Sequence, residues 1–377
     1  MKKTFCFVQM YHISERGGGA EVQANFLAQE LARQGHDVHY ICKADSNAQR
    51  SVLMGEIKVH FIGNLSGYSA ISLHLIYNHI INIKPDFIVE RMSSYFAAAI
   101  LKAKKQINFK YIWICTDNES ALPYKTMWNY IRKLPLHKAI YILPRAFIID
   151  VVRTRAILNA EIRFTQNNIQ KKRLTRYFGV TSNQMISGHP TENIDSLSVS
   201  SKFQNRVVIW CGNLGRHKRP ELFIALAKLA QKRNYKFILI GGHANKKYKE
   251  SLFSFCPDNI TKTGQLSYEE ALTYFDSASI FVNTSWSEGF SNTYIQAWLR
   301  GVPTIVFGSD PDNIIRDKQL GFDVKSVQEA LGKLDELLND QDIYRKFSLR
   351  VENYARENHT IELMTENFTG LIENQHV

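Results

Sequence analysis

A glutamate and a glutamine lie eight residues apart across the start of a predicted helix, in the stretch SWSEGFSNTYIQAW at residues 285–298. Glu288 precedes the helix, where its carboxylate can accept hydrogen bonds from sugar hydroxyls. Ser291 or Asn292 can cap the helix, and the N–H groups of its first turn remain available for a phosphate. Asn292 and Gln296 are four residues apart and share a face. A capping acid with a solvent-facing glutamine is the alternative interpretation.

A second group of charged residues is the loop GNLGRHKRPELF, residues 212–223, between a predicted strand and a predicted helix. Arg216, Lys218 and Arg219 therefore lie at the carboxyl edge of a sheet. Three cations there can neutralise a diphosphate and stabilise the charge that grows on a leaving nucleoside diphosphate. The alternative is that these side chains only face water, since Pro220 and Glu221 are ordinary first-turn residues.

Three glycines join the first predicted strand to the first predicted helix, in YHISERGGGAEVQ at residues 11–23. Gly17, Gly18 and Gly19 let the backbone come close to a ligand at a helix N-terminus, which favours an anion. The loop is neither G-x-G-x-x-G nor a Walker A sequence, which argues against a nicotinamide dehydrogenase. A turn without a ligand is the alternative.

Two pairs of polar residues follow other predicted strands. Asp310 and Asp312, in SDPDN, have the D-x-D spacing that can hold a metal on a diphosphate, but Pro311 between them also suits a plain turn. Asp117 and Asn118 follow the strand KYIWICT at a carboxyl edge. They can orient an acceptor hydroxyl or a donor sugar, or form an ordinary loop.

The elements that position these residues alternate between short apolar strands and amphipathic helices along the whole chain, which predicts parallel sheets covered on both faces. Residues 188–204, GHPTENIDSLSVSSKFQ, are polar and without a period. We therefore predict an α/β protein with a first doubly wound domain at 1–190, a linker at 191–204 and a second at 205–354. A helix at about 355–377 can pack back on the first domain. Ligands in such sheets bind at the carboxyl ends of the strands.

The composition is that of a soluble globular protein, with 45% hydrophobic and 22% charged residues among 377. The five cysteines are far apart, which indicates a reducing compartment and no zinc site. The apolar run after Met1-Lys2-Lys3 is too short for a signal peptide, and residues 139–152 are too broken to span a membrane. We expect a cytoplasmic protein.

Most of the net charge of +12 lies in residues 124–176, which hold twelve Lys or Arg against Asp150 and Glu161. Trp128, Tyr130, Tyr141 and Phe147 are interleaved with these cations, a mixture typical of segments that lie on an anionic lipid surface. A solvated basic face is the alternative. Nucleic acid is a less suitable anionic partner, because the chain also carries sugar-nucleotide motifs.

The chain resembles the family-4 retaining glycosyltransferases of GT-B fold. The resemblance rests on GGGAEVQANFLAQELARQGHDV, on GNLGRHKRPELF, and on TGQLSYEEALTYFDSASIFVNTSWSEGFSNTYIQAWLRGVPTIVF. It implies two Rossmann-like doubly wound domains facing across a cleft. The first would bind an acceptor and the second a nucleotide-sugar donor, without a cofactor or a metal.

The resemblance also implies roles for particular residues. Lys218 would hold the diphosphate and Glu288 the donor-sugar hydroxyls, with Arg216 and Asp117 as further catalytic candidates. The donor-binding candidates are Gly18, Gly19, Asn213, Gly289, Phe290, Ser291, Asn292 and Gln296. Three places depart from the family pattern. Asn213 replaces an arginine, which Arg216 can substitute, Gln296 replaces the second acid of Glu-x7-Glu, and Thr116-Asp117 stands where a histidine is frequent.

The leading hypothesis is therefore a hexosyltransferase, with UDP favoured as the donor nucleotide, that extends a lipid-linked or oligosaccharide acceptor in bacterial cell-surface polysaccharide synthesis. It would dock peripherally on the inner face of the membrane through residues 124–176. Two alternatives stay open: a catalytically weak sugar-nucleotide-binding partner subunit of another transferase, and a GT-B nucleotide-sugar epimerase.

Overall fold

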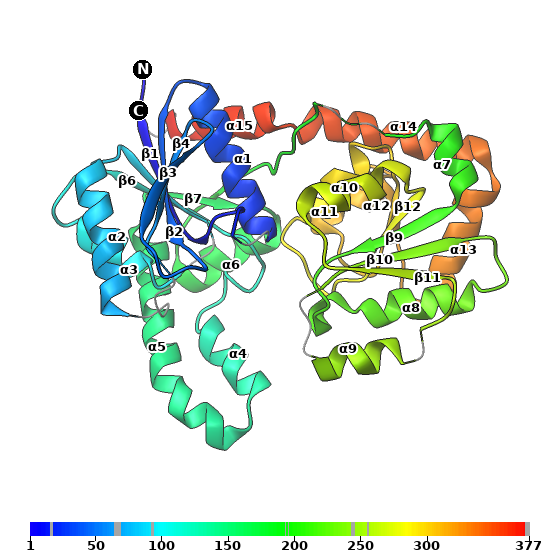
Figure 1. Cartoon of the computed structure of the whole chain (residues 1–377), viewed down its shortest axis with the longest axis horizontal. Coiled ribbons are helices and arrows are strands. Elements are labelled where there is room, and N and C mark those ends of the chain that lie inside the picture. Colours follow the sequence, from blue (N-terminus) through cyan, green and yellow to red (C-terminus); the bar gives the residue numbers. More distant parts are fainter. Residues whose placement is uncertain are drawn as a thin grey trace. The chain divides into compact units, whose positions relative to one another are not determined.

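The computed structural model describes residues 1–15, 18–63, 69–91, 94–192, 194, 196–242, 246–254 and 256–373. The chain divides into two compact units, each built on its own sheet (Figure 1). Unit 1 comprises Met1–Gly188 and Ile361–Val377, and unit 2 comprises His189–Thr360. Each unit has the layered α/β architecture that the alternating sequence pattern predicts.

Unit 1 contains an eight-stranded sheet with the order β3-β4-β2-β1-β5-β6-β7-β8. All neighbours are parallel except β3, which is antiparallel to β4. The strand order reverses between β1 and β5, which makes their carboxyl ends the expected place for a ligand. The strands are β1 (Thr4–Tyr11), β2 (Asp37–Lys43), β3 (Arg50–Met54), β4 (Ile57–Phe61), β5 (Phe87–Arg91), β6 (Lys110–Ile114), β7 (Ile162–Thr165) and β8 (Asn183–Gln184).

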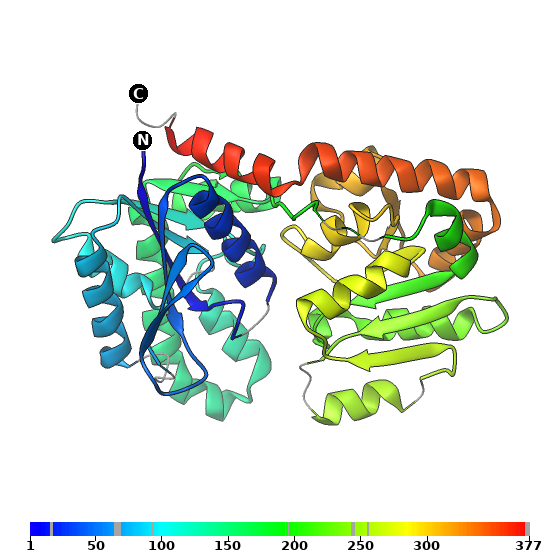
Figure 2. The same cartoon turned by 45° about the horizontal axis from the view of Figure 1, so that its top comes forward.

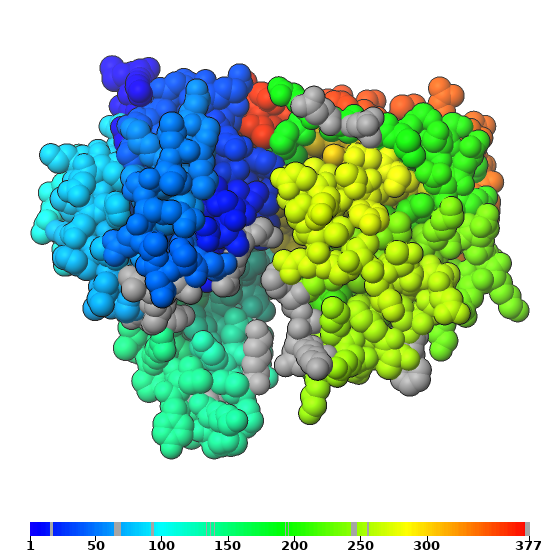
Figure 3. Space-filling view, viewed as in Figure 1, coloured from blue at the N-terminus to red at the C-terminus, as the bar shows by residue number. Residues whose placement is uncertain are grey.

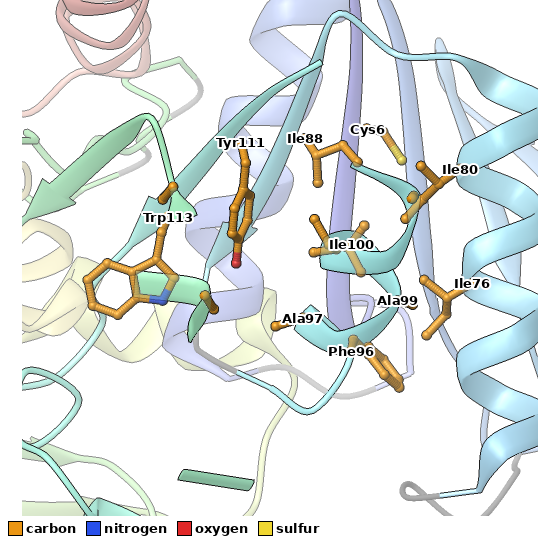
Figure 4. Packing of buried hydrophobic residues seen from close by; sticks show 14 of the residues in the cluster. Cys6, Ile76, Ile80, Ile88, Phe96, Ala97, Ala99, Ile100, Tyr111 and Trp113 are labelled. Atoms are coloured by element: carbon orange, nitrogen blue, oxygen red, sulfur yellow. The ribbon is translucent and has the colours of Figure 1, made fainter. Parts of the chain in front are cut away.

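Helices bury both faces of this sheet. On one face Cys6, Ile88 and Trp113 pack with Ile80 of α2 and Ile100 of α3, in a fully buried cluster (Figure 4). On the other face Phe5 and Phe164 contact Phe368 of α15, with ring centroids 6.3 and 5.4 Å apart. The helices of unit 1 are α1 (Gly19–Arg33), α2 (Ala70–Ile83), α3 (Ala97–Ala103), α4 (Lys125–Lys133), α5 (Leu136–Asn159), α6 (Asn168–Phe178) and α15 (Ile361–Glu373).

Helices α4 and α5 form a hairpin that projects beyond the sheet of unit 1 (Figures 1 and 3). The buried carboxylate of Asp150 on α5 fixes the start of α4, accepting the N–H groups of Thr126 at 3.0 Å and Met127 at 2.9 Å. A carboxylate at a helix N-terminus satisfies otherwise unpaired donors. Arg153, one turn away on α5, neutralises it with an ion pair of 2.8 Å.

Unit 2 contains a parallel six-stranded sheet with the order β11-β10-β9-β12-β13-β14. Here the order reverses between β9 and β12. The elements are α7 (Val199–Asn205), β9 (Val207–Cys211), η1 (Arg216–Lys218), α8 (Pro220–Leu229), β10 (Lys236–Ile240), α9 (Lys246–Phe253), β11 (Ile260–Gly264), α10 (Tyr268–Ser277), β12 (Ile280–Asn283), α11 (Asn292–Trp298), β13 (Thr304–Val306), η2 (Pro311–Asn313), α12 (Ile314–Asp317), β14 (Gly321–Asp323), α13 (Val327–Asn339) and α14 (Gln341–Asn358).

The sheet of unit 2 is also covered on both faces, and Figure 2 shows α8 and α9 on one of them. There Phe223 of α8 and Leu334 of α13 are fully buried against Leu239. On the opposite face Trp298 of α11 and Val351 of α14 belong to a second buried cluster. Helix α11 thus buries its apolar side and begins directly at the carboxyl edge of the sheet.

Three local features differ from the sequence-based expectation. The polar stretch expected as a linker contains helix α7, which Ser198 begins by accepting the N–H of Ser201 at 3.2 Å. Strand β3 was not predicted, because its largely exposed sequence RSVLM lacks an apolar run. The single C-terminal helix is two helices, α14 and α15, which meet at His359 and Thr360. Only the second of them belongs to unit 1.

Candidate functional site

Two loops flank the point in unit 2 where the strand order reverses. One follows β9 and leads through η1 to α8, and the other follows β12 and leads to α11. These are the two loops whose charged residues suggested chemistry in the sequence. Because β9 and β12 are adjacent parallel strands, their carboxyl ends bring the loops together at the position where open α/β sheets bind ligands.

Hydrogen bonds fix the two loops to each other. Trp286 donates its N–H to the carbonyl of His217 at 2.8 Å. Thr284 donates its hydroxyl to the carbonyl of Lys218 at 2.5 Å and accepts the indole N–H of Trp210 at 2.8 Å. Since Trp210 and Thr284 are buried, these bonds are shielded from water and position Lys218 on a rigid support.

Arg219 is a structural residue rather than one of three cations for a ligand. Its guanidinium donates to the carbonyls of Thr284 at 2.7 Å, Ser285 at 3.2 Å and Phe307 at 2.5 Å. Its backbone φ of +47° at the start of α8 turns the side chain toward these strand ends. The expectation that Arg216, Lys218 and Arg219 act together is therefore corrected for Arg219.

Lys218 and Glu288 form an ion pair between the ammonium Nζ and the carboxylate Oε1. The side chains are 21% and 15% exposed, so the pair is partly shielded yet open to a ligand. The structure thus brings together the two residues to which the sequence assigned the diphosphate and the sugar. Each neutralises the other when no other charge is near.

Asn213 and Arg216 are exposed at the same loop. The guanidinium of Arg216 lies 5.9 Å from the centroid of the Tyr248 ring, where a cation–π contact orients it. It lines a surface pocket of about 410 Å³ with Glu221, Ile224, Tyr248, Ser251 and Leu252. In this arrangement Arg216 faces α9, whereas Lys218 faces the second loop.

The start of α11 supplies backbone groups to the edge of the site. Ser291 is the N-cap residue, yet its side chain makes no capping bond and its hydroxyl lies 2.8 Å from that of Thr293. Gly289 is buried, and Asn292 is half-buried as the first residue of the helix. The centroid of the Phe290 ring lies 4.9 Å from that of the His359 ring. This contact anchors the loop to the interior of unit 2.

Gln296 is only 7% exposed, and its side-chain amide lies beside the hydroxyl of Tyr268. That hydroxyl is 3.0 Å from Nδ1 of His189, which is also buried. Burial first, then the charges of Arg300 and His359, lower the pKa of His189 to about 3, so this imidazole is neutral at pH 7. Gln296 is thus part of a buried polar row and does not face solvent.

The glycine loop belongs to unit 1. Gly19 begins α1 and Gly18 is its N-cap residue, whereas Gly17 lies outside the described residues. A Cβ atom at Gly18 would lie 2.3 Å from Oε2 of Glu21. A larger residue at position 18 would therefore require the end of the Glu21 side chain to move.

Asp117, the candidate of unit 1 at the end of β6, is held by its neighbours. Its carboxylate accepts the N–H of Ser120 at 2.8 Å and pairs with Lys125 at 2.8 Å. Burial alone would raise the pKa of Asp117, but the charge of Lys125 and the bonds from Ser120 outweigh it, and the pKa lies below its ordinary value. The side chain is 41% exposed and stays a charged acceptor at neutral pH. Asn118 accepts the amide of Asn167 at 2.9 Å and is buried.

The D-x-D pair does not bring two free carboxylates together. Asp310 accepts the N–H groups of Ile315 at 2.8 Å and Arg316 at 3.0 Å, and so caps α12. Asp312 adopts a φ of +53° within η2. Among the described residues there is no group of three or more His, Cys, Asp or Glu with metal-binding geometry. No helix in the described parts of the chain is long and apolar enough to cross a bilayer.

Sequence reasoning missed the residues that support the site. Trp210, Thr284 and Tyr268 contact their partners only through the tertiary fold. A contact within unit 1 was missed as well: the amide of Gln23 on α1 donates to the carbonyl of Gly188 at 2.7 Å and accepts the N–H of Gly188 at 3.2 Å. This buried pair fixes the last residue of unit 1 before the chain enters unit 2. A separation of 165 residues leaves no local sequence signal for it.

Two family models match the chain, and together they include strands of both sheets. Glycosyltransferase Family 4 matches residues 17–163, and Glycosyl transferases group 1 matches residues 195–358, which hold Lys218 and Glu288. The chain belongs to the family-4 glycosyltransferases of GT-B fold. In this family-4 chain the matched segments include the glycine loop and both loops of unit 2.

The chain is also similar to individual proteins. An uncharacterized glycosyltransferase of Haemophilus influenzae is 21% identical over 183 residues, which are 46% of this chain and 50% of that protein. The match thus spans about half the length of this relative. Sucrose-phosphate synthase from Thermosynechococcus elongatus has the same fold, with a TM-score of 0.79 at 14% identity over 100% of this chain and 99% of that one. Anabaena HepE in complex with UDP and glucose gives a TM-score of 0.73 at 14% identity, over 99% and 100%.

Proposed function

We propose that this family-4 protein is a retaining glycosyltransferase that moves a hexose from a nucleotide-sugar donor to a glycan or lipid-linked acceptor. The Lys218–Glu288 pair carries the proposal. It places a cation and a carboxylate side by side where the strand order of unit 2 reverses. A glycosyl diphosphate needs both groups, one for its phosphates and one for its sugar hydroxyls.

In the proposed reaction the donor exchanges the partners of this pair. The diphosphate takes the ammonium of Lys218, and the carboxylate of Glu288 becomes free to accept hydrogen bonds from the sugar. Backbone N–H groups at Ser291 and Asn292 add donors toward the phosphate. We propose that these groups, rather than a divalent metal, neutralise the charge of the leaving diphosphate.

Retention would follow from attack on the face that the diphosphate leaves. The bond between the anomeric carbon and the diphosphate oxygen breaks while the acceptor oxygen forms a bond to the same carbon. The proton of the acceptor hydroxyl passes to the departing phosphate oxygen. The protein contributes position and electrostatic stabilisation, with Lys218 held by the bond from Thr284 to its carbonyl.

We propose UDP as the nucleotide of the donor, a choice that the fold of HepE, whose structure holds UDP, supports. A thermal-shift screen of UDP-, GDP- and ADP-sugars tests it. A donor present at 100 times its dissociation constant stabilises the folded protein by about 2.7 kcal/mol. We expect this stabilisation from UDP-sugars, and an equal response to all three nucleotides would refute the preference.

We further propose that the protein docks peripherally on an anionic membrane, at the inner face of the cell membrane, through the α4–α5 hairpin. Large apolar side chains are exposed along both helices and the turn before them: Tyr124, Trp128, Ile131, Ile140, Tyr141, Phe147 and Ile148. Tyr141 is 87% exposed and Ile148 is 62% exposed. Exposed aromatic and aliphatic groups on one projecting hairpin favour insertion among lipid headgroups.

The twelve cations of residues 124–176 do not all serve the same purpose. Four of the twelve serve the interior of unit 1: Lys125 binds Asp117, Arg153 binds Asp150, and Arg163 and Arg173 donate to backbone carbonyls. Lys138 and Arg132 are exposed on the hairpin beside its apolar side chains. We propose that these cations attract anionic lipid and bring the protein to a lipid-linked acceptor of bacterial cell-surface polysaccharide synthesis.

A sugar-nucleotide-binding subunit without activity of its own is the second candidate, favoured by Asn213 where the family usually has an arginine. Incubation of the purified chain with a UDP-sugar separates the two. Binding without release of UDP, with or without acceptor, supports the subunit. Release of a free epimer in the absence of acceptor would instead indicate an epimerase.

A further inference from the structure

Arg91 is the last residue of β5, and Gln9 lies two residues before the end of β1, on the two central strands of unit 1 where its strand order reverses. Strands β1 and β5 pair in parallel, with Phe7 opposite Val89. Gln9 and Arg91 each follow this pair by two residues along their strands. This is the position in unit 1 that corresponds to the Lys218–Glu288 site of unit 2, and none of the roles assigned above uses either residue.

Both side chains are buried and retain unused hydrogen-bonding groups. Gln9 is 1% exposed and Arg91 is 3% exposed. Within the described part of the chain, neither polar atom of the Gln9 amide has a hydrogen-bond partner, and neither do Nε and Nη1 of Arg91. Buried polar groups are nearly always satisfied, so two unsatisfied groups on neighbouring strands need an explanation.

The charge of Arg91 is not neutralised by an ion pair with a described residue. Its Nη2 lies 3.3 Å from the amide oxygen of Gln166, in the orientation where that amide donates to the carbonyl of Thr116 at 3.0 Å. Burial lowers the pKa of Arg91 to about 10, partly offset by the charge of Glu21, so the guanidinium stays a cation at neutral pH. No carboxylate of the described residues lies within ion-pairing distance of it.

The second buried arginine of unit 1 shows the usual arrangement. Arg153 is 5% exposed and pairs with Asp150 at 2.8 Å. Removing one partner of such a buried pair is strongly destabilising, because the other charge is left without compensation. Removing a buried cation that has no internal partner relieves a desolvation cost instead. Arg91 and Arg153 therefore differ in what their loss should do to stability.

We propose that Arg91 and Gln9 form a site for an anionic group of the acceptor, a phosphate or a carboxylate. Nε and Nη1 of Arg91 offer unused N–H donors to such an anion, and the Gln9 amide adds another. The site rests on the proposed function for its link to an acceptor, whereas anion binding itself does not depend on it. Both side chains are covered in this structure, so the anion enters by displacing part of that cover.

The first test compares the thermal stability of Arg91→Met and Arg153→Met in the full chain. Methionine keeps the length and apolar stem of arginine without its charge. We expect Arg91→Met to be at least as stable as the parent and Arg153→Met to be clearly less stable. If Arg91→Met is destabilised as much as Arg153→Met, then Arg91 has an internal structural role and the proposal is overturned.

The second test titrates inorganic phosphate and, separately, acetate at constant ionic strength, with binding followed by calorimetry in the absence of nucleotide. We expect the dissociation constant of the preferred anion to rise about tenfold or more in Arg91→Met, and also in Gln9→Leu by a smaller factor. Preference for phosphate points to a lipid or sugar phosphate, and preference for acetate points to an acidic sugar.

Three further outcomes would overturn the anion site, and a fourth would refute only the proposed function. The proposal is overturned if the parent protein binds neither anion, or if Arg91→Met binds both as the parent does. It is also overturned if phosphate binding survives in Arg91→Met and disappears in Lys218→Met, since the anion then lies in unit 2. A chain that releases no nucleotide from any sugar donor but shows the Arg91-dependent binding would refute the proposed function alone.

Discussion

The ammonium of Lys218 and the carboxylate of Glu288 are ion-paired at the carboxyl edge of the sheet of unit 2. They come from two loops that are 70 residues apart in sequence and are held together by Thr284 and Trp286. The relationship means that a diphosphate has to compete with Glu288 for Lys218. In the proposed reaction, the carboxylate of Glu288 would become available to the sugar only when that competition succeeds.

Glu288→Ala should abolish activity, whereas Gln296→Glu should retain it. Glu288 is a partly exposed carboxylate beside Lys218, and alanine offers no acceptor for the donor sugar. Glutamate at position 296 can accept a hydrogen bond from the hydroxyl of Tyr268, which lies beside the present amide. Initial rates with a UDP-sugar compare the two variants. The reverse result would show that the two roles are exchanged.

Arg219→Lys should destabilise unit 2 by about 2 to 4 kcal/mol, because an ammonium cannot reach the three carbonyls that the guanidinium binds. Denaturant unfolding measures the change. Arg233→Lys is the matched control, since Arg233 is 49% exposed in a surface pair with Asp335 and should change stability little. Equal stability of the two variants would contradict a structural role for Arg219.

The contrast between Lys218 and Arg219 shows what the sequence could and could not predict. The alternation of strands and helices predicted both sheets, because apolar periodicity is a local property. It also placed both residues in one strand-to-helix loop. The two side chains bind different partners because Arg219 takes a positive φ and donates to carbonyls 65 to 88 residues away. Partners so distant in sequence come together only in the folded chain.

The same limit applies to the buried polar groups. Glu288 and Gln296 were identified from their spacing across a helix start, and the structure places both near the edge of the sheet. The proximity of Gln296 to Tyr268, and the lack of a carboxylate within ion-pairing distance of Arg91 among the described residues, depend on neighbours contributed by other strands and helices. An exposed edge strand such as β3 was missed for the opposite reason, since it buries too little to show a pattern.

Unit 1 should lose stability as the pH falls, and His60 should contribute to this loss. Its imidazole lies 2.9 Å from His39 and 2.8 Å from Ser51, and its ring lies 4.9 Å from His79. Burial, then the charges of His79, His39 and Lys58, lower the pKa of His60 from 6.5 to about 4. Between pH 6.5 and about pH 4, this imidazole is protonated in the unfolded chain but not in the folded protein. The free energy of unfolding therefore falls by up to about 1.4 kcal/mol for each pH unit over this range.

His60→Gln should therefore flatten the decline of unfolding free energy between those two pH values, while His39 and His79 maintain part of it. Urea unfolding at several pH values measures the slope. His137→Gln, a change on the exposed surface of α5, is the control and should leave the slope as it is. An unchanged slope in His60→Gln would mean that its proton uptake is the same in the folded and unfolded states.

Membrane docking should depend on the apolar surface and on the charge of the α4–α5 hairpin. Flotation with vesicles that contain phosphatidylglycerol should recover the parent protein, and vesicles of phosphatidylcholine alone should not. The double variant Tyr141→Ser, Ile148→Ser and the double variant Arg132→Glu, Lys138→Glu should each lower recovery on the order of tenfold. Leu53→Ser removes an exposed side chain elsewhere in unit 1 and is the control. Equal recovery from both vesicle types would refute electrostatic docking.

The central claim is that Lys218 stabilises the leaving diphosphate of a sugar nucleotide. The direct measurement is the rate of UDP release from a UDP-sugar by the parent protein, by Lys218→Ala and by Lys325→Ala, which breaks a surface pair in the same unit. We predict a loss of about 100-fold in Lys218→Ala, the scale for one preorganised charge partner, and parent activity in Lys325→Ala. A rate within threefold of the parent in Lys218→Ala would contradict the account.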